Sequence, residues 1–75
     1  MLEERAGRYR AAADHYTRAL AAYQRIGEVT SRAHVLTRLG TVEARLGRGE
    51  AGQDHLRLAM VLHRQAGHQL SLIHI

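Results

Sequence analysis

Six histidines are the residues of this 75-residue chain whose chemistry first suggests a metal site. A helical zinc site presents two histidines on one helix face, four residues apart. No two histidines here have that spacing: His55 and His63 are eight apart, and Gly67 interrupts the stretch from His63 to His68. The sequence therefore predicts no metal ligands, and we interpret the histidines as solvated or boundary residues.

Two other patterns suggest chemistry and are also weak. The segment from Gly47 through Gly49 to Gly52 matches the spacing of a dinucleotide-binding loop, but it follows a helical pattern rather than a strand. No Ser, His and Asp lie in a context typical of nucleophilic catalysis. We therefore expect no catalytic residues, no cofactor and no enzymatic activity of this chain alone.

A period of 40 residues organises the elements that carry these side chains. Residues 3–28 align without a gap with residues 43–68, and nine of the 26 aligned positions are identical. The identical pairs are Glu3/Glu43, Arg5/Arg45, Gly7/Gly47, Arg8/Arg48, Ala11/Ala51, Asp14/Asp54, His15/His55, Ala19/Ala59 and Gly27/Gly67. A fixed period of this length is the mark of a stacked-repeat architecture, which presents an extended surface to a partner.

Periodicity and glycine punctuation predict an all-α fold. The expected helices span residues 8–26, 28–46 and 49–66, with a helical stub at 1–6 and breaks at the matched glycines. Because the connections are short, neighbouring helices must pack antiparallel. The predicted core consists of Tyr16, Ala19, Leu20, Tyr23, Leu36, Leu39, Gly40, Leu46, Leu56, Ala59 and Met60.

Two polar features of the repeat need an explanation in the fold. Glu43 falls on the packing face of the middle helix, so its carboxylate must reach an edge or meet an arginine. His15 and His55, which are repeat equivalents, are expected to point outward from the packing face.

Composition limits the classes of function. The formal net charge is +4, all eleven basic residues are arginine, and they are scattered among seven acidic residues rather than clustered. A nucleic-acid footprint would be a basic stripe or block, so we do not expect direct nucleic-acid binding. There is no cysteine, no apolar run of about 18 residues and no signal-peptide pattern, which predicts a cytoplasmic protein without a membrane segment.

The repeat resembles the tetratricopeptide repeat, a helix pair with Leu-Gly in its first helix, Gly at the turn, and small and bulky residues alternating in its second. The residues that carry the resemblance are Leu36, Leu39, Gly40, Gly47, Gly52, Leu56, Ala59 and Met60, and in the other copy Gly7, Ala12, Tyr16, Ala19 and Leu20. The usual repeat has about 34 residues. The longer period here resembles the extended variant found in bacterial transcriptional activators and signalling ATPases.

The resemblance implies an α-solenoid fragment of antiparallel helix pairs over residues 1–68, about one and a half repeats of an array that continues in a larger regulatory protein. It implies a protein-interaction scaffold whose partners are a protein or peptide and the adjacent repeats. The alternative is a nucleic-acid-associated module that uses the arginine-rich surface directly.

One surface is a candidate partner-binding site. At about 100° per residue, His34, Arg38, Thr41 and Arg45 fall opposite the apolar side of the middle helix. In tetratricopeptide arrays the first helix of each pair lines the concave groove, so the resemblance implies that these residues and Thr37 face a partner. Arginine and histidine suit an acidic or carboxylate-bearing peptide. The alternative is an ordinary solvated helix face.

The last residues, 69–75, fall outside the repeat pattern. Leu70–Ile75 reads Leu-Ser-Leu-Ile-His-Ile, which resembles the in-frame translation of a transposon-end adapter used in sequencing libraries. We therefore expect this tail to contribute nothing to function. The alternative is a short natural tail.

Overall fold

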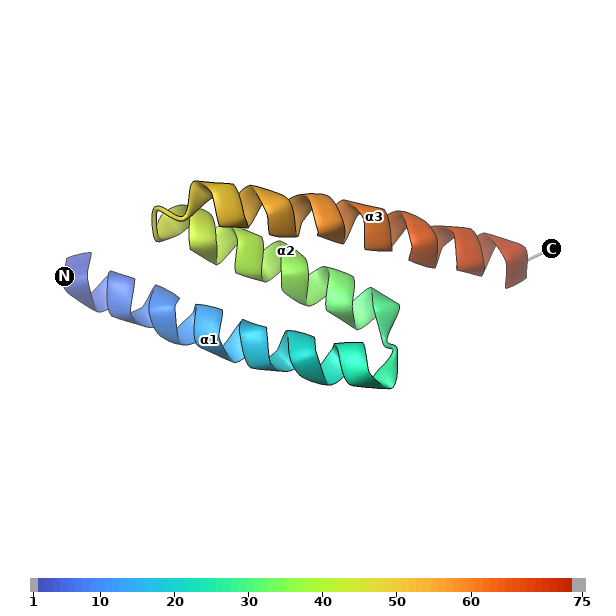
Figure 1. Ribbon diagram of the computed structural model, residues 1–75, viewed down its shortest axis with the longest axis horizontal. Coiled ribbons are helices and arrows are strands. Elements are labelled where there is room, and N and C mark those ends of the chain that lie inside the picture. Colours follow the sequence, from blue (N-terminus) through green and yellow to red (C-terminus); the bar gives the residue numbers. More distant parts are fainter. Residues whose placement is uncertain (1, 74–75) are drawn as a thin grey trace.

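The computed structural model describes the backbone of residues 2–73 and the side chains of residues 6–68. It consists of three helices, α1 (Leu2–Ile26), α2 (Val29–Arg45) and α3 (Gly49–Ile73), and the described residues contain no strand. Consecutive helices run in opposite directions (Figure 1). The helix α2 lies between α1 and α3, and among the described residues only α2 packs against both other helices. The expected all-α fold with antiparallel neighbours is confirmed.

Two glycines make the turns between the helices. Gly27 and Gly47 have φ of 72° and 79°, which a residue with a Cβ adopts only with strain. After α2, the Gly47 N–H donates to the Ala44 carbonyl at 3.2 Å and the Arg48 N–H donates to the Glu43 carbonyl at 2.8 Å. These two bonds form a Schellman motif, which satisfies carbonyl groups at the end of a helix.

The turn after α1 repeats this arrangement. The Gly27 N–H donates to the Gln24 carbonyl at 3.4 Å, and the Glu28 N–H donates to the Tyr23 carbonyl at 3.0 Å. The predicted helix ends at both glycines are thereby confirmed.

The expected breaks at Gly7 and Gly67 are wrong. The helix α1 runs unbroken through Gly7, and α3 runs through Gly67 to Ile73, so there is no separate stub at 1–6. A glycine inside a helix costs about 1 kcal/mol relative to alanine, which a long helix tolerates. A turn forms at Gly47 because α3 then folds back and buries apolar side chains against α2. Gly7, although identical in the repeat, gains no such packing from the described residues.

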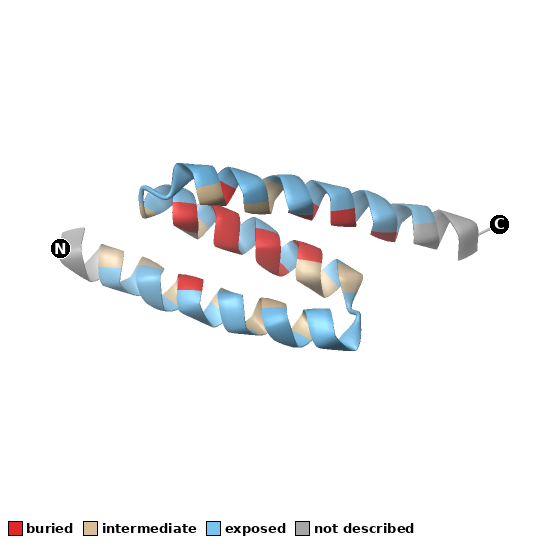
Figure 2. Cartoon of the chain, viewed as in Figure 1, coloured by how far each residue is buried: buried red, intermediate tan, exposed pale blue. Residues whose placement is uncertain are grey.

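The core lies mainly between α2 and α3. Figure 2 shows buried residues along most of α2 and on the side of α3 that faces it, whereas α1 contributes few. The central cluster consists of Ala33, Leu36, Ala59 and Leu62, with Leu20 and Val29 packed against it.

The predicted core is correct in part. Leu36, Leu39, Gly40 and Ala59 are buried, while the predicted residues that are only half-buried are Tyr16, Ala19, Leu20, Tyr23, Leu46 and Leu56. The prediction that Met60 is buried is wrong, because this residue is 56% exposed. The buried residues that the prediction missed are Ala13, Ala33, Val35, Glu43, Gly52, Leu62 and Ala66.

The error at Met60 has a geometric cause. By the repeat, Met60 is equivalent to Leu20, which α1 presents to the core beside α2. The helix α3 packs against α2 through a different side, on which Ala59, Leu62 and Ala66 recur at helical spacing. Equivalent positions of α1 and α3 therefore have different neighbours.

Glycines bring α2 and α3 into backbone contact. A Cβ added at Gly40 would lie 2.7 Å from the Leu56 Cγ and 2.8 Å from the Gly52 carbonyl oxygen. A Cβ added at Gly52 would lie 2.8 Å from the Gly40 carbonyl oxygen. No larger residue fits at either position without moving a helix, so these glycines determine how closely the two helices approach.

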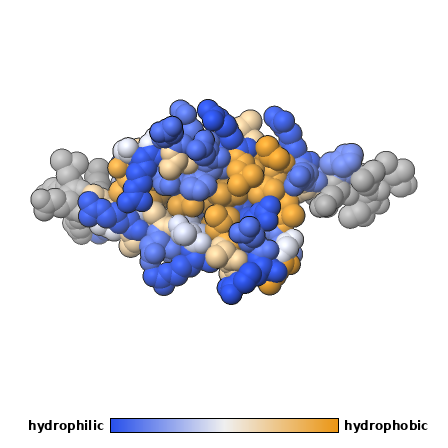
Figure 3. Space-filling view, in the orientation of Figure 1, coloured by the Kyte–Doolittle hydropathy of each residue, from blue (hydrophilic) through white to orange (hydrophobic). Residues whose placement is uncertain are grey.

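Some large apolar side chains stay exposed. They include Ile26, Leu58, Met60 and Val61. On the face seen in Figure 3, hydrophobic surface gathers in the middle of the molecule between hydrophilic side chains. Among the helices that the structure describes, none combines the length and the apolar character that crossing a bilayer requires.

Candidate functional site

The candidate partner-binding residues all lie on the solvent-facing side of α2. Each of the five is exposed: His34, Thr37, Arg38, Thr41 and Arg45. They stand opposite the buried side of the same helix, which carries Leu36, Leu39 and Gly40. We call His34, Arg38 and Arg45 the basic stripe, since they recur on one line along the helix. The structure therefore brings the predicted residues together on one exposed face.

Contacts within α2 hold the first half of the basic stripe in place. Arg38 Nε donates a hydrogen bond to His34 Nε2 at 3.0 Å. Because Nε2 accepts this bond, the neutral imidazole of His34 carries its proton on Nδ1. The guanidinium of Arg38 keeps its terminal nitrogens as donors for another group.

The two threonines contribute less than the sequence suggests. The Thr37 hydroxyl donates to the Ala33 carbonyl at 3.1 Å, and the Thr41 hydroxyl donates to the Thr37 carbonyl at 2.9 Å. Each hydroxyl proton is therefore engaged by its own helix. Toward a ligand these residues present mainly a methyl group and a hydrogen-bond acceptor.

Arg45 ends the basic stripe beside α1. Its guanidinium carbon lies 5.9 Å from the centroid of the Tyr9 ring, within the range of a cation–π contact. This contact orients Arg45 without neutralising it. It also links α1 to the end of α2.

The basic stripe has no acidic neighbour on its own helix. The only acidic residue of α2 is Glu43, which is 7% exposed and lies on the buried side. Two arginine–aspartate ion pairs, Arg18–Asp14 and Arg57–Asp54, lie on α1 and α3. Within the described part of the chain, Arg38 and Arg45 make no ion pair with a carboxylate.

The partner of the Glu43 carboxylate differs from the one that the sequence predicts. Its carboxylate contacts Nδ1 of His55 on α3, rather than an arginine or the solvent. His55 accordingly points toward the interface and is half-buried, so the expectation that it points outward is wrong. His15 is exposed, as expected, and its ring contacts Tyr16. Glu43 and His55 lie twelve residues apart, a separation that only the turn at Gly47 closes.

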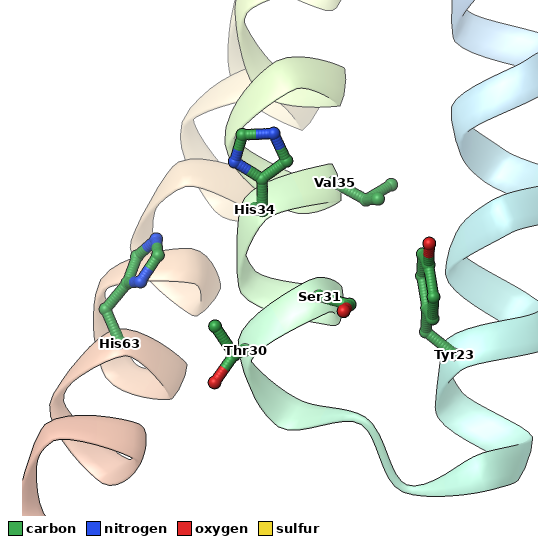
Figure 4. A pocket seen from close by; sticks show the side chains of 6 residues that line it. All are labelled: Tyr23, Thr30, Ser31, His34, Val35 and His63. Carbon is green, nitrogen blue, oxygen red and sulfur yellow. The ribbon is translucent and has the colours of Figure 1, made fainter. Parts of the chain in front are cut away.

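A groove of about 350 Å³ opens at the first turns of α2. All three helices line it, through Tyr23 of α1, Thr30, Ser31, His34 and Val35 of α2, and His63 of α3. In Figure 4 the ring of His63 points toward His34, while Ser31 and Val35 point toward Tyr23. We call this feature the His34 groove. His34 belongs both to the groove and to the basic stripe, so the two are continuous.

Sequence reasoning missed most of the His34 groove. The sequence predicts Tyr23 in the core, but it is half-buried, and His63 is exposed. Their approach to α2 depends on how the three helices pack, which no local pattern reports. The polar residues Thr30 and Ser31 at the start of α2 were the only available signal.

No three His, Asp or Glu side chains of the described residues come together as a metal ion would require. In comparisons with known proteins, no family model matches the chain, and neither a curated protein nor a solved structure matches it.

Proposed function

We propose that this chain is a protein-interaction module that binds an acidic peptide along the basic stripe of α2. The observation that carries the proposal is the state of the two arginines. Arg38 and Arg45 are exposed on a helix face with no acidic residue, and neither pairs with a carboxylate of the described residues. Arginine forms charge-assisted, bidentate hydrogen bonds to carboxylates, so these side chains suit acidic partners.

The architecture we propose is a segment of a helix-pair array of the tetratricopeptide type, part of a larger bacterial regulatory protein. Two observations support it. The repeat of 40 residues relates residues 9–26 of α1 to residues 49–66 of α3. The helix α2 packs antiparallel to both, as the first helix of a pair would against its own partner and against the preceding repeat (Figure 1). Exposed Leu58 and Val61 on α3 are then available to a following helix.

Binding of a labelled acidic peptide tests the function. We expect a short Glu- and Ser-containing peptide to bind in fluorescence anisotropy, and Arg38→Ala with Arg45→Ala to weaken it at least about tenfold together, or about 1.4 kcal/mol. The matched control is Arg18→Ala with Arg57→Ala, because those arginines are exposed but lie on α1 and α3 in pairs with aspartates. If the two double variants lose the same affinity for the peptide, net charge alone explains the binding, and the proposal is contradicted.

The same assay separates the nucleic-acid alternative. If random duplex DNA binds more tightly than the peptide, with an affinity that falls steeply with salt, the basic surface serves nucleic acid instead. A peptide-binding module should show the reverse order of affinity at physiological ionic strength.

A further inference from the structure

We propose that α1 carries a docking surface for a partner helix, and that this helix has the chemistry of α2. The surface is separate from the basic stripe and lies on a side of α1 on which no residue is buried. We call it the His15 face, and it consists of Ala12, His15, Ala19, Ala22 and Ile26. The partner is an amphipathic helix of another polypeptide that places a carboxylate against His15.

The interface between α2 and α3 provides the template for this surface. The Glu43 carboxylate of α2 contacts His55, and Leu36 of α2 packs in one cluster with Ala59 and Leu62. The α3 residues involved recur three and four residues apart, as positions on one helix face do. Four of the five are buried and the histidine is half-buried; the set is Gly52, His55, Ala59, Leu62 and Ala66.

The repeat places the same kind of surface on α1. Each residue of the His15 face lies 40 positions before one of these α3 residues, and the histidine is identical in the two copies. Ile26 is 70% exposed, although its equivalent Ala66 is only 9% exposed. Because Ala22 replaces Leu62, the larger apolar side chain lies one turn farther along α1. The helix α1 therefore presents, uncovered, the type of surface with which α3 holds α2.

His15 defines the polar group that the partner must bring. Its repeat equivalent on α3 accepts contact from the Glu43 carboxylate inside the interface. Within the described part of the chain no carboxylate contacts His15, whose ring lies against Tyr16, and the adjacent Asp14 is paired with Arg18. A partner carboxylate buried at this position would need a hydrogen bond, which the imidazole can donate.

A second copy of the chain does not supply this helix. The side of α2 with the required chemistry is already packed against its own α3, where Leu36 is 0% and Glu43 is 7% exposed. The partner is therefore a separate helix with the α2 pattern: a leucine, a small residue four positions later, and a carboxylate three positions after that. In α2 these positions are Leu36, Gly40 and Glu43.

A labelled peptide with the sequence of residues 28–46 tests the proposal against the full chain. This peptide contains three arginines and two glutamates, so it does not resemble an acidic ligand of the basic stripe. In fluorescence anisotropy we expect saturable binding that His15→Ala in the chain, or Glu43→Gln in the peptide, weakens about fivefold or more. The two changes together should weaken binding no further than either alone, because both remove one contact.

Two matched variants of the chain locate the peptide. Ile26→Ser and Met60→Ser each replace an exposed apolar side chain, but only Ile26 belongs to the His15 face. We expect Ile26→Ser to weaken binding and Met60→Ser to leave it unchanged. The opposite result would place the peptide on α3 and overturn the proposal. Binding that is unaffected by His15→Ala would also overturn it, as when the peptide displaces the chain's own α2 and meets His55.

Three further outcomes complete the test. Arg38→Ala with Arg45→Ala should leave binding of this peptide unchanged, so the His15 face and the acidic-peptide function stand or fall separately. If the peptide does not bind at all, the docking surface is wrong. In sedimentation velocity the chain without peptide should be a monomer; a dimer that Ile26→Ser dissociates would assign the His15 face to a second copy and overturn the proposal.

Discussion

The carboxylate of Glu43 on α2 meets the imidazole Nδ1 of His55 on α3, across the most buried interface of the molecule. The Glu43 side chain is almost fully withdrawn from solvent, while His55 keeps about a third of its side chain exposed, 31%. Burying a carboxylate costs free energy unless the group is hydrogen-bonded. The contact with His55 offsets this cost for Glu43. The pair joins the two helices on either side of the turn at Gly47.

Removing His55 should destabilise the fold through Glu43. We expect His55→Ala to lower the free energy of unfolding by about 1–3 kcal/mol, since it leaves a buried acceptor without its partner. Urea denaturation followed by circular dichroism measures the change. The repeat-equivalent substitution His15→Ala is the matched control, because His15 is exposed, and it should change stability by less than about 0.5 kcal/mol. Similar effects of both substitutions would contradict the role of the pair.

Gly40→Ala should separate α2 from α3. The added Cβ would meet the Gly52 carbonyl oxygen at 2.8 Å, and a backbone atom cannot move aside as a flexible side chain can. Overpacking of this kind costs about 1–3 kcal/mol. Thermal unfolding should show a lower midpoint, and an unchanged midpoint would mean that the two helices are farther apart than described.

The two repeat-equivalent glycines should respond in opposite directions to alanine. Gly7→Ala should stabilise the protein by about 0.5–1 kcal/mol, because Gly7 is helical and a Cβ there meets no atom within 4 Å. Gly47→Ala should destabilise it, because a φ of 79° strains any residue with a Cβ. Chemical denaturation of both variants measures the difference. Destabilisation by Gly7→Ala would show that a turn forms at Gly7 after all.

Core truncation should distinguish the inner from the outer side of the helices. Leu36 is fully buried at 0% exposure, so Leu36→Ala should cost about 2–5 kcal/mol. Met60 is 56% exposed, so Met60→Ala should cost far less, although the sequence pattern placed both residues in the core. Equal losses in urea denaturation would mean that Met60 is covered in solution, for example by a second copy of the chain.

The sequence by itself determined the helical class of the fold, the position of α2 between Gly27 and Gly47, and the exposed side of that helix. Gly27 and Gly47 can take a left-handed conformation at no steric cost, which permits a turn at each, and the apolar residues of α2 recur at helical spacing. The basic stripe followed from the same rule, because residues opposite a buried stripe must face the solvent. His34, Arg38 and Arg45 are therefore placed correctly on an exposed face.

Only the tertiary structure shows which of the two repeat-equivalent glycines, Gly7 and Gly47, ends a helix and which lies inside one. Both glycines are followed by arginine, but Tyr9 stands where the other copy has Gly49, and only after Gly47 does a following helix pack back. The partner of Glu43 and the lining of the His34 groove also depend on which helices meet. These contacts join residues far apart in the sequence, and their energy comes from burial between helices, which local periodicity does not contain.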